Sequence, residues 1–361
     1  MGWVILVIAA AGVAGYLRQP MFGRLPDKIS LAKMKKSAHW QHGHFRNIHP
    51  TPQMTGEGGF FATMYDFYFK KHPHTKPEQP LPVLKYDIKA EDKNKDLLIW
   101  FGHSSYYIQL GGKSFLVDPV FSANASPLPH NVVPFLGTDV YTPEDMPKVD
   151  GIIITHDHYD HLDYATVKKL RDKVKRVVVP LGVGAHFRRW GYRPEIIEEL
   201  DWDEELSFEN GRIVCLPARH FSGRMLPYRS LWASFLLEIA GYRLYIGGDS
   251  GYDDHYRQIG ERFAPIDLAL LECGQYDANW RFIHQQPEEG FKAAEDLRAK
   301  RVFLGHNSKF CICNHPWREP LDKAAELAKE SKVKLITPQI SEAVNLRDET
   351  QQFTRWWKDC I

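Results

Sequence analysis

Short apolar runs separated by polar turns dominate the chain from residue 96 onward. Leu97–Phe101 predicts a strand, and Tyr106–Leu110 with Ser114–Val117 predicts a hairpin that turns at Gly111 and Gly112. Further apolar runs lie at Ile152–Ile154, Ile213–Leu216, Leu244–Ile246 and Arg301–Leu304. Each of these later runs ends in a loop that carries a histidine or an aspartate, and such loops hold side chains at the rim of a sheet. The pattern predicts an α/β domain with its chemistry at the strand ends.

The densest group of candidate ligands follows the strand predicted at Gly151–Ile154. Residues 155–163 read Thr-His-Asp-His-Tyr-Asp-His-Leu-Asp, and a helix is predicted directly after them at Tyr164–Arg171. Neutral imidazole is the commonest protein ligand for zinc, and carboxylate oxygen is the next natural donor. One bend can aim His156 and His158 at one metal, while Asp160 and His161 face a neighbouring metal.

Three later strand ends deliver matching donors. His220 follows Ile213–Leu216, Asp249 follows Leu244–Ile246, and His306 follows Arg301–Leu304. Any one of them alone is more typical of a structural histidine or a turn aspartate. Together with the loop 155–163 they make seven donors, a number that suits two metal ions sharing a carboxylate.

Composition limits the partners. The chain of 361 residues has 46 Lys and Arg against 45 Asp and Glu, so its net charge is +1 and the basic excess typical of nucleic-acid binding is absent. Five scattered cysteines do not suggest a disulfide framework. Cys311 and Cys313 stand in a Cys-Ile-Cys-Asn-His stretch whose spacing matches no common zinc pattern, which favours ordinary packing.

An uncharged apolar run occupies Trp3–Leu17. As a helix it would be about 22 Å long, shorter than a ~30 Å hydrocarbon core, and it lacks the basic start of a secretory signal. Basic residues follow it from Arg18 to Lys36. We expect residues 1–19 to associate with a membrane surface and the body to lie on the cytoplasmic side, with a cleaved signal or a docked helix as alternatives.

The remaining boundaries follow from changes in composition. Residues 20–95 are polar and rich in Pro and Gly, with a possible helix near Phe60–Lys70, and are predicted to be a linker and cover. The histidines of this segment, His39, His42, His44 and His49, favour a solvated loop. Residues 96–348 form the predicted catalytic domain and 349–361 a tail. Within the domain, Ser122–Pro147 is a long loop, and loops of that length are usually functional or disordered.

The sequence resembles the metallo-β-lactamase superfamily, which implies an α/β fold of the αββα sandwich type with a dinuclear site. Across roughly residues 45–345 it further resembles N-acylphosphatidylethanolamine-hydrolysing phospholipase D and its bacterial relatives. The motifs that carry this likeness are Trp100–Ser104, Asp118–Ser122, Thr155–Asp163, Glu199–Trp202, Gly248–Tyr252, Ile259–Asp267 and Gln286–Glu289.

The resemblance assigns roles by position. It implies two zinc ions per chain, one held by His156, His158 and His220 and the other by Asp160, His161 and His306, with Asp249 bridging. His284 matches a family histidine near the site, for which a proton-transfer role and a supporting role are both open. Asp160 and Asp249 are candidates to orient the metals and to accept a proton. The Cys311–Cys313 stretch departs from the family pattern.

These features predict a zinc-dependent phosphodiesterase in which a hydroxide bridging the two metals attacks an N-acylated phospholipid or a similar amphiphile. Arg219, Arg224 and Arg229 flank His220 in the sequence and are candidates for clamping a phosphate, with a solvated surface position as the alternative for each. A lactonase or other carboxylic-ester hydrolase is the alternative within hydrolases. A diiron oxidoreductase is disfavoured because it would need a carboxylate in place of His158, and a non-enzymatic scaffold would not need all seven donors. Nothing in the sequence indicates the oligomeric state.

Overall fold

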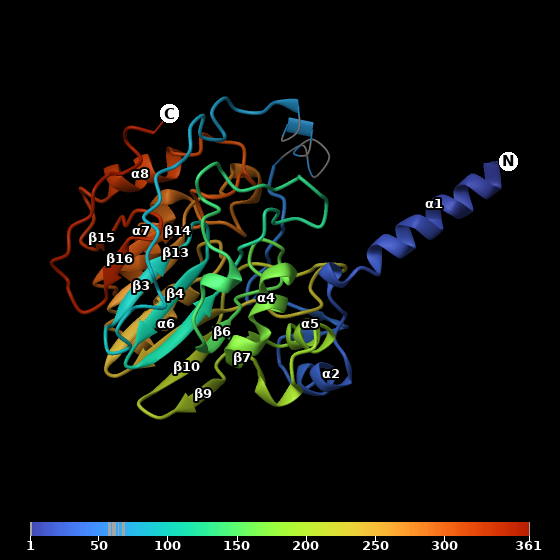
Figure 1. Ribbon diagram of the computed structural model, residues 1–361, viewed down its shortest axis with the longest axis horizontal. Helices are drawn as coiled ribbons and strands as arrows, with labels where there is room; N and C mark the ends of the chain where they lie inside the picture. Colours follow the sequence, from blue (N-terminus) through green and yellow to red (C-terminus); the bar gives the residue numbers. More distant parts are fainter. Residues whose placement is uncertain (1, 57–58, 60–62, 64, 67–68, 361) are drawn as a thin grey trace.

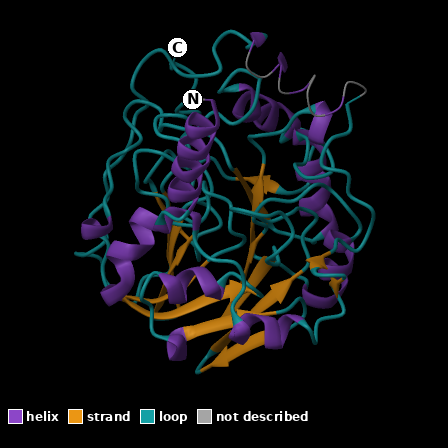
Figure 2. Ribbon diagram, turned by 90° about the vertical axis from the view of Figure 1, so that its right-hand side faces the viewer, coloured by secondary structure: helices purple, strands orange, loops and turns teal. Residues whose placement is uncertain are grey.

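Two seven-stranded sheets lie face to face, with helices on their outer sides (Figure 2). The structure is a computed structural model that describes the chain except residues 1, 57–58, 60–62, 64, 67–68 and 361. The first sheet has the order β16 (Ala343–Asn345), β3 (Leu97–Trp100), β4 (Tyr106–Leu110), β5 (Lys113–Val117), β6 (Val149–Ile153), β7 (Val174–Pro180) and β8 (Ile197–Leu200). The second has the order β15 (Lys334–Leu335), β14 (Arg301–Gly305), β13 (Leu268–Glu272), β12 (Tyr242–Ile246), β11 (Ser234–Ile239), β10 (Gly211–Leu216) and β9 (Glu205–Phe208).

The helices complete a four-layer αββα sandwich. The first sheet packs against α4 (Tyr164–Leu170) and α5 (Gly184–Arg189). The second packs against α6 (His255–Phe263), α7 (Pro287–Asp296) and α8 (Glu319–Leu327). Each sheet is apolar on both faces because one face packs on the other sheet and the opposite face packs on helices. In β4, for example, Ile108 lies in the core between the sheets and Tyr107 lies in the outer core beside the helices.

Strand direction brings the candidate ligands to one edge. β3 and β5 are both antiparallel to β4, and β5 is parallel to β6, so β3, β5 and β6 run the same way. In the other sheet β10 and β12 are both antiparallel to β11, and β12, β13 and β14 are parallel. The two sheets meet where these strands end, because the backbones of His103 and Asn307 pair there. The carboxyl ends of strands in such sheets are the usual place for a ligand site.

The N-terminal segment has two parts. Helix α1 (Gly2–Leu17) projects away from the body, as Figure 1 shows. Helix α2 (Lys28–Met34) and the short pair β1 (Trp40–Gln41) and β2 (His44–Phe45) lie on the domain. Among the described residues, none of the helices combines the length and apolar character needed to cross a membrane.

The predicted elements are largely confirmed. The hairpin, the strand before the histidine loop and the helix after it are β4–β5, β6 and α4, each within a few residues of the expected bounds. The helix expected near Phe60–Lys70 lies largely outside the described residues. The loop Ser122–Pro147 contains a single 3₁₀ turn at Pro143–Asp145. The domain boundaries stay predictions.

Candidate metal centre

Three histidines form the first group of the site. His156 and His158 come from the loop after β6, and His220 follows β10. Nε2 of His156 lies 2.9 Å from Nδ1 of His158, which lies 3.3 Å from Nε2 of His220. His156 and His220 are almost completely buried, so their ring nitrogens converge at a point that bulk water does not surround.

Asp160, His161 and His306 form the second group, joined by His103. Nε2 of His161 lies 3.5 Å from Oδ2 of Asp160, and Nε2 of His306 lies 3.7 Å from the same oxygen. One ligand atom of each of these four residues lies within 4.8 Å of the others.

Asp249 stands between the two groups and directs one oxygen to each. Its Oδ2 lies 3.8 Å from Nε2 of both His156 and His220. Its Oδ1 lies 3.2 Å from Nε2 of His161 and contacts Nδ1 of His306. The side chain is 2% exposed. This is the arrangement expected of a carboxylate shared between two cations.

The protonation states favour cation binding. Burial, assisted by neighbouring histidines, holds the pKa of His156 and His220 well below the usual value, so both rings are neutral and offer a lone pair. Burial alone would raise the pKa of Asp249, but His161 and His306 lower it well below its usual range. Neutral imidazoles around ionised carboxylates are the donor set that a divalent metal ion requires.

The ring of His161 faces three carboxylates, those of Asp118, Asp160 and Asp249. Burial alone would lower its pKa, but Asp249, Asp160 and Asp118 raise it well above the usual value. Its Nε2 and Oδ1 of Asp249 are both buried and make no hydrogen bond of good geometry within the described part of the chain. A proton on His161 balances carboxylates that a metal ion would balance better. The residues therefore fit metal ions.

Two residues that the sequence analysis did not single out hold the ligands in place. His103, which follows β3, lies with Nε2 2.9 Å from Oδ2 of Asp160. Asp118, which follows β5, accepts hydrogen bonds from the backbone N–H and hydroxyl of Thr155 and lies 2.8 Å from Nδ1 of His161. Such outer contacts fix the orientation of a ligand and its tautomer. The signal for His103 was the same Gly-His sequence at a strand end that marks His306.

His284 is paired with a buried glutamate. Its Nδ1 lies 2.6 Å from Oε2 of Glu272, the last residue of β13, and Oε1 of Glu272 accepts the backbone N–H of Ser250. Burial alone would lower the pKa of His284, but the Glu272 carboxylate raises it to about 9. The sequence analysis missed Glu272 because strand β13 was not recognised.

A cavity of about 360 Å³ opens over the ligands. His158, Asp160, His220, Asp249, His284 and His306 line its floor. Its walls are mainly apolar and include Met54, Val132, Phe221, Trp280, Ile283 and Ile312, and the lysines Lys71 and Lys76 lie at its margin. Of the long loop Ser122–Pro147, Val132 lines the cavity, Phe135 is buried in the core, and Leu128 and Leu136 are exposed.

The candidate arginines lie outside the lining of this cavity, and Arg219 donates to the hydroxyl of Thr51 and the backbone carbonyl of Pro50. Arg224 donates to the backbone carbonyls of Met21, Asp157 and Leu162, and its guanidinium lies 4.0 Å above the ring of Tyr159. Arg229 lines a small cavity beside His186. None of the three is among the described residues that line the cavity over the ligands. Arg224 lies outside the cavity because its guanidinium binds the backbone oxygens of Asp157 and Leu162 in the metal loop. The role of the arginines in substrate binding stays a prediction.

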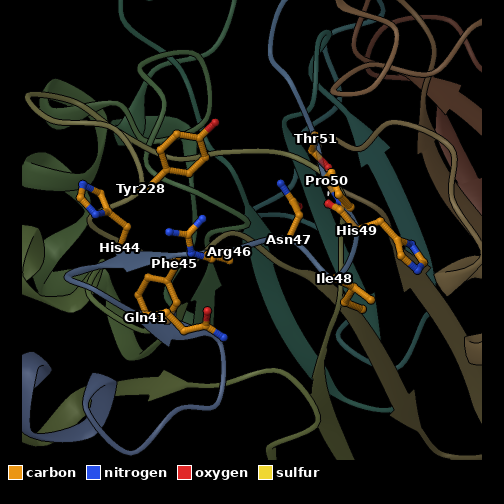
Figure 3. A pocket seen from close by; sticks show the side chains of 10 residues that line it. All are labelled: Gln41, His44, Phe45, Arg46, Asn47, Ile48, His49, Pro50, Thr51 and Tyr228. Atoms are coloured by element: carbon orange, nitrogen blue, oxygen red, sulfur yellow. Dashed lines mark hydrogen bonds between the residues drawn. The ribbon is translucent and has the colours of Figure 1, made fainter.

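A second cavity, of about 580 Å³, lies along the segment Gln41–Thr51 (Figure 3). Figure 3 shows Arg46 of this segment below the ring of Tyr228 and Asn47 to the right of it. None of the seven ligands lines it. His49 is exposed there and pairs with Asp253, in keeping with the solvated histidines predicted for this segment.

Comparison with known proteins identifies the protein family to which the chain belongs. Residues 113–307 match the family described as the β-lactamase superfamily domain. An archaeal metallo-hydrolase from Ignicoccus hospitalis superposes with a TM-score of 0.54 at 21% identity, over 69% of this chain and 97% of that one. The chain therefore belongs to the metallo-β-lactamase superfamily, and the predicted fold is confirmed.

Two relatives within this superfamily are similar to the chain in sequence over most of its length. An uncharacterised protein of Mycobacterium tuberculosis is 33% identical over 342 residues, which are 91% of this chain and 89% of that protein. A protein of Caenorhabditis elegans named N-acyl-phosphatidylethanolamine-hydrolyzing phospholipase D 1 is 31% identical over 273 residues, which are 69% of this chain and 75% of that one. The resemblance stated from the motifs is thus confirmed, and the chain has the fold of metal-dependent hydrolases.

Proposed function

We propose that the protein is a dinuclear zinc phosphodiesterase of the phospholipase D type, acting on N-acylphosphatidylethanolamine or a similar amphiphile. The observation that carries the proposal is Asp249, buried, with one oxygen toward each of two ligand groups at the floor of an apolar cavity. The similarity to the C. elegans phospholipase supports the substrate class. Imidazole nitrogens and carboxylate oxygens are donors that suit zinc.

His156, His158 and His220 would hold one ion, Asp160, His161 and His306 the other, and Asp249 both. Bound in this way, two zinc ions supply hydroxide at neutral pH and neutralise charge on a phosphoryl group. Asp160 is held in position by His103, and we assign it and Asp249 the task of orienting the ions. Glu272 accepts the Nδ1–H of His284, which leaves Nε2 of a ring that lines the cavity to pass a proton to the leaving alcohol.

The cavity walls suit the two ends of such a substrate. Met54, Phe221, Trp280 and Ile283 offer apolar surface for an acyl chain, and burial of such surface contributes roughly 25 cal/mol per Å². Lys71 and Lys76 at the margin provide positive charge for a phosphate. A lactone would use the apolar wall but would gain less from the lysines.

The test is cleavage in water enriched in heavy oxygen. With N-acylphosphatidylethanolamine and zinc-loaded protein, we expect the label in the phosphatidic acid and none in the N-acylethanolamine, because attack on phosphorus leaves the alcohol oxygen untouched. Label in a carboxylate product, or much faster turnover of a lactone than of any phosphodiester, would replace this proposal by the carboxylic-ester hydrolase. Zinc-loaded protein without substrate and substrate without protein are the blanks.

Met54 provides a test of the acyl-chain wall. Met54→Ala removes apolar surface worth about 1–2 kcal/mol, so kcat/KM for a long-chain substrate should fall roughly five- to thirtyfold. A short-chain analogue should change by less than about twofold, because it does not reach the wall. Met225→Ala, at a residue 45% exposed outside this cavity, is the matched control. Equal losses for long and short substrates would show that Met54 does not contact the chain.

We further propose that α1 binds a lipid surface and brings the cleft to its substrate. Trp3, Leu6, Val7 and Ile8 are 83%, 63%, 65% and 66% exposed, and 16 residues of helix span about 24 Å. Such a helix exposes apolar side chains on all sides, and Arg18, Arg24 and Lys28 follow it, where anionic headgroups would attract them.

Flotation with vesicles of phosphatidylethanolamine and phosphatidylglycerol measures this association. Full-length protein should float with the vesicles, and Leu6→Asp with Ile8→Asp should reduce the floating fraction at least tenfold, because buried charge is costly in lipid. Leu84→Asp, at a residue 50% exposed on the body, should float like the unaltered chain. If the double variant floats as well as the Leu84 variant, α1 is not the binding element.

A further inference from the structure

A pair of cysteines lies at the margin of the cavity over the metal ligands. The loop between β14 and α8 carries Cys311 and Cys313, and Cys311 is half-buried and lines the same cavity as His158 and Asp160. The sequence analysis expected ordinary packing for both. Both side chains do pack, Cys313 beside Trp280 and Ile283 and Cys311 against the core between the sheets, but Cys311 also reaches the cavity.

The two thiols contact one another. The thiol of Cys311 donates a weak hydrogen bond to the carbonyl oxygen of Cys313 at 3.5 Å, and the side chain of Cys313 lies close enough to lower the pKa of the Cys311 thiol. The backbone between them is fixed, since the N–H of Ile312 donates to the side-chain oxygen of Gln275. One sulfur therefore faces the cavity while the other supports it from within the protein.

The surroundings favour the thiolate of Cys311. The side chain of Cys313 lowers its pKa; burial opposes this, but the hydroxyl of Thr75 and the charges of Lys76 and Lys71 add to the lowering, and the pKa is about 6. The other half-buried cysteine, Cys360, has its pKa raised by burial. Cys215 and Cys273 are fully buried, and burial raises the pKa of both. Only Cys311 among the five combines access with a stabilised thiolate.

We propose that Cys311 and Cys313 form a hydroperoxide-reactive dithiol at the mouth of the metal cleft, with Cys311 as the attacking thiolate and Cys313 as the resolving thiol. The Cys311 sulfur attacks one peroxide oxygen, the O–O bond breaks, and hydroxide leaves; the sulfur is oxidised to a sulfenic acid and the peroxide is reduced. The Cys313 sulfur then attacks the Cys311 sulfur, the S–O bond breaks, and water leaves with the thiol proton. A dithiol reductant reverses the reaction.

The consequence for the cleft follows from the positions of the two sulfurs. A sulfenic oxygen on Cys311 stands within the cavity, beside the lysines at its margin. A disulfide would draw Cys313 away from Trp280 and Ile283, which form part of the apolar wall. Oxidation thus changes the cavity surface that a substrate bound over the candidate metal ligands would contact. The oxidation of the two cysteines does not itself depend on which substrate binds there.

The first experiment uses the unaltered full-length chain, so that no variant has to fold. Iodoacetamide at neutral pH, followed by peptide mass spectrometry, should label Cys311 at least about tenfold faster than Cys360, because reactivity follows the thiolate fraction. In a separate sample that has not been alkylated, stoichiometric hydrogen peroxide should remove two hydrogen atoms from the intact mass, consume two thiols, and leave a peptide with an internal Cys311–Cys313 disulfide that dithiothreitol reopens. Labelling of Cys360 at an equal or greater rate, or reduced Cys311 and Cys313 at a dose that oxidises Cys360, would overturn the proposal.

Two variants separate the roles of the sulfurs. With Cys313→Ser, oxidation should stop at the sulfenic acid, which dimedone traps on Cys311. With Cys311→Ser, Cys313 should remain reduced at the same dose. Cys360→Ser is the matched control and should form the disulfide like the unaltered chain. Dimedone on Cys313 in place of Cys311 would reverse the assignment and overturn it.

Discussion

Asp249→Asn should release both metal ions and reduce turnover by at least ~10²–10³-fold, the loss typical when a group that stabilises transition-state charge is removed. The substitution keeps the shape of the side chain but removes the charge that both ligand groups share. Elemental analysis should fall from about two ions per chain, the number for a two-metal site, to less than one.

His156→Ala provides the comparison that makes this result specific. His156 belongs to one ligand group, so its loss should lower the metal content by about one ion and leave the other bound. Asp172→Asn, at a side chain 86% exposed, should retain both ions and full turnover. Circular dichroism of the three variants should match the unaltered chain. If Asp249→Asn loses no more metal than His156→Ala, Asp249 does not bridge two ions.

The convergence of the candidate metal ligands could be predicted from the sequence because strand direction determines which loops lie at the same edge. Residues that directly follow strands of one direction in the two sheets must meet at the same edge, so His220, Asp249 and His306 could be joined to the loop after β6 without knowing any distance. The same rule reaches His103, which follows β3, but its Gly-His-Ser sequence was interpreted only as a turn. Glu272 was missed because it requires recognition of β13, an apolar strand that ends in an acid.

Side-chain direction was not predictable in the same way. Arg224 lies four residues after His220, which suggested a phosphate contact, but its guanidinium turns to the carbonyls of Asp157 and Leu162 behind the metal loop. Sequence separation says nothing of which face of a loop a long side chain takes. The reactive setting of Cys311 likewise depends on Thr75, Lys71 and Lys76, more than 230 residues away in the chain.

Contacts between the N-terminal segment and the domain were the least predictable feature. The sequence indicated a polar cover, and the structure shows that Asp27 and Ser30 attach it to Arg188 and Glu199. Arg188 binds Asp27 through two nitrogens, at 2.7 and 2.9 Å, and lies 3.1 Å from Oε2 of Glu199. Glu199 is 2% exposed and also accepts the hydroxyl of Ser30 and the backbone N–H of Gly182.

Arg188→Ala should destabilise the protein by about 3–5 kcal/mol, the usual cost of leaving a buried charge without its partner. The melting temperature should fall by several degrees, and trypsin should cut after Lys28 and Lys33 faster, because α2 loses its attachment to α5. Arg176→Ala breaks the pair with Glu198, whose side chains are 54% and 32% exposed, and should cost less than about 1 kcal/mol. Equal melting temperatures for the two variants would contradict the prediction.

The pH dependence of this pair has a definite sign. Burial alone would raise the pKa of Asp27, but Arg188 and the backbone N–H groups of Ser30 and Ile29 lower it below the usual value for an aspartate. The native state therefore binds the Asp27 proton more weakly than the unfolded chain does, so the pair stabilises the protein above the unfolded pKa and loses that contribution as the pH falls through the native pKa. In Arg188→Ala this part of the acid dependence should be reduced, and the difference in melting temperature between the variant and the unaltered chain should shrink as the pH is lowered below about 4. A difference that stays constant from neutral pH to that range would mean that the Asp27 charge does not contribute to holding α2 on the domain.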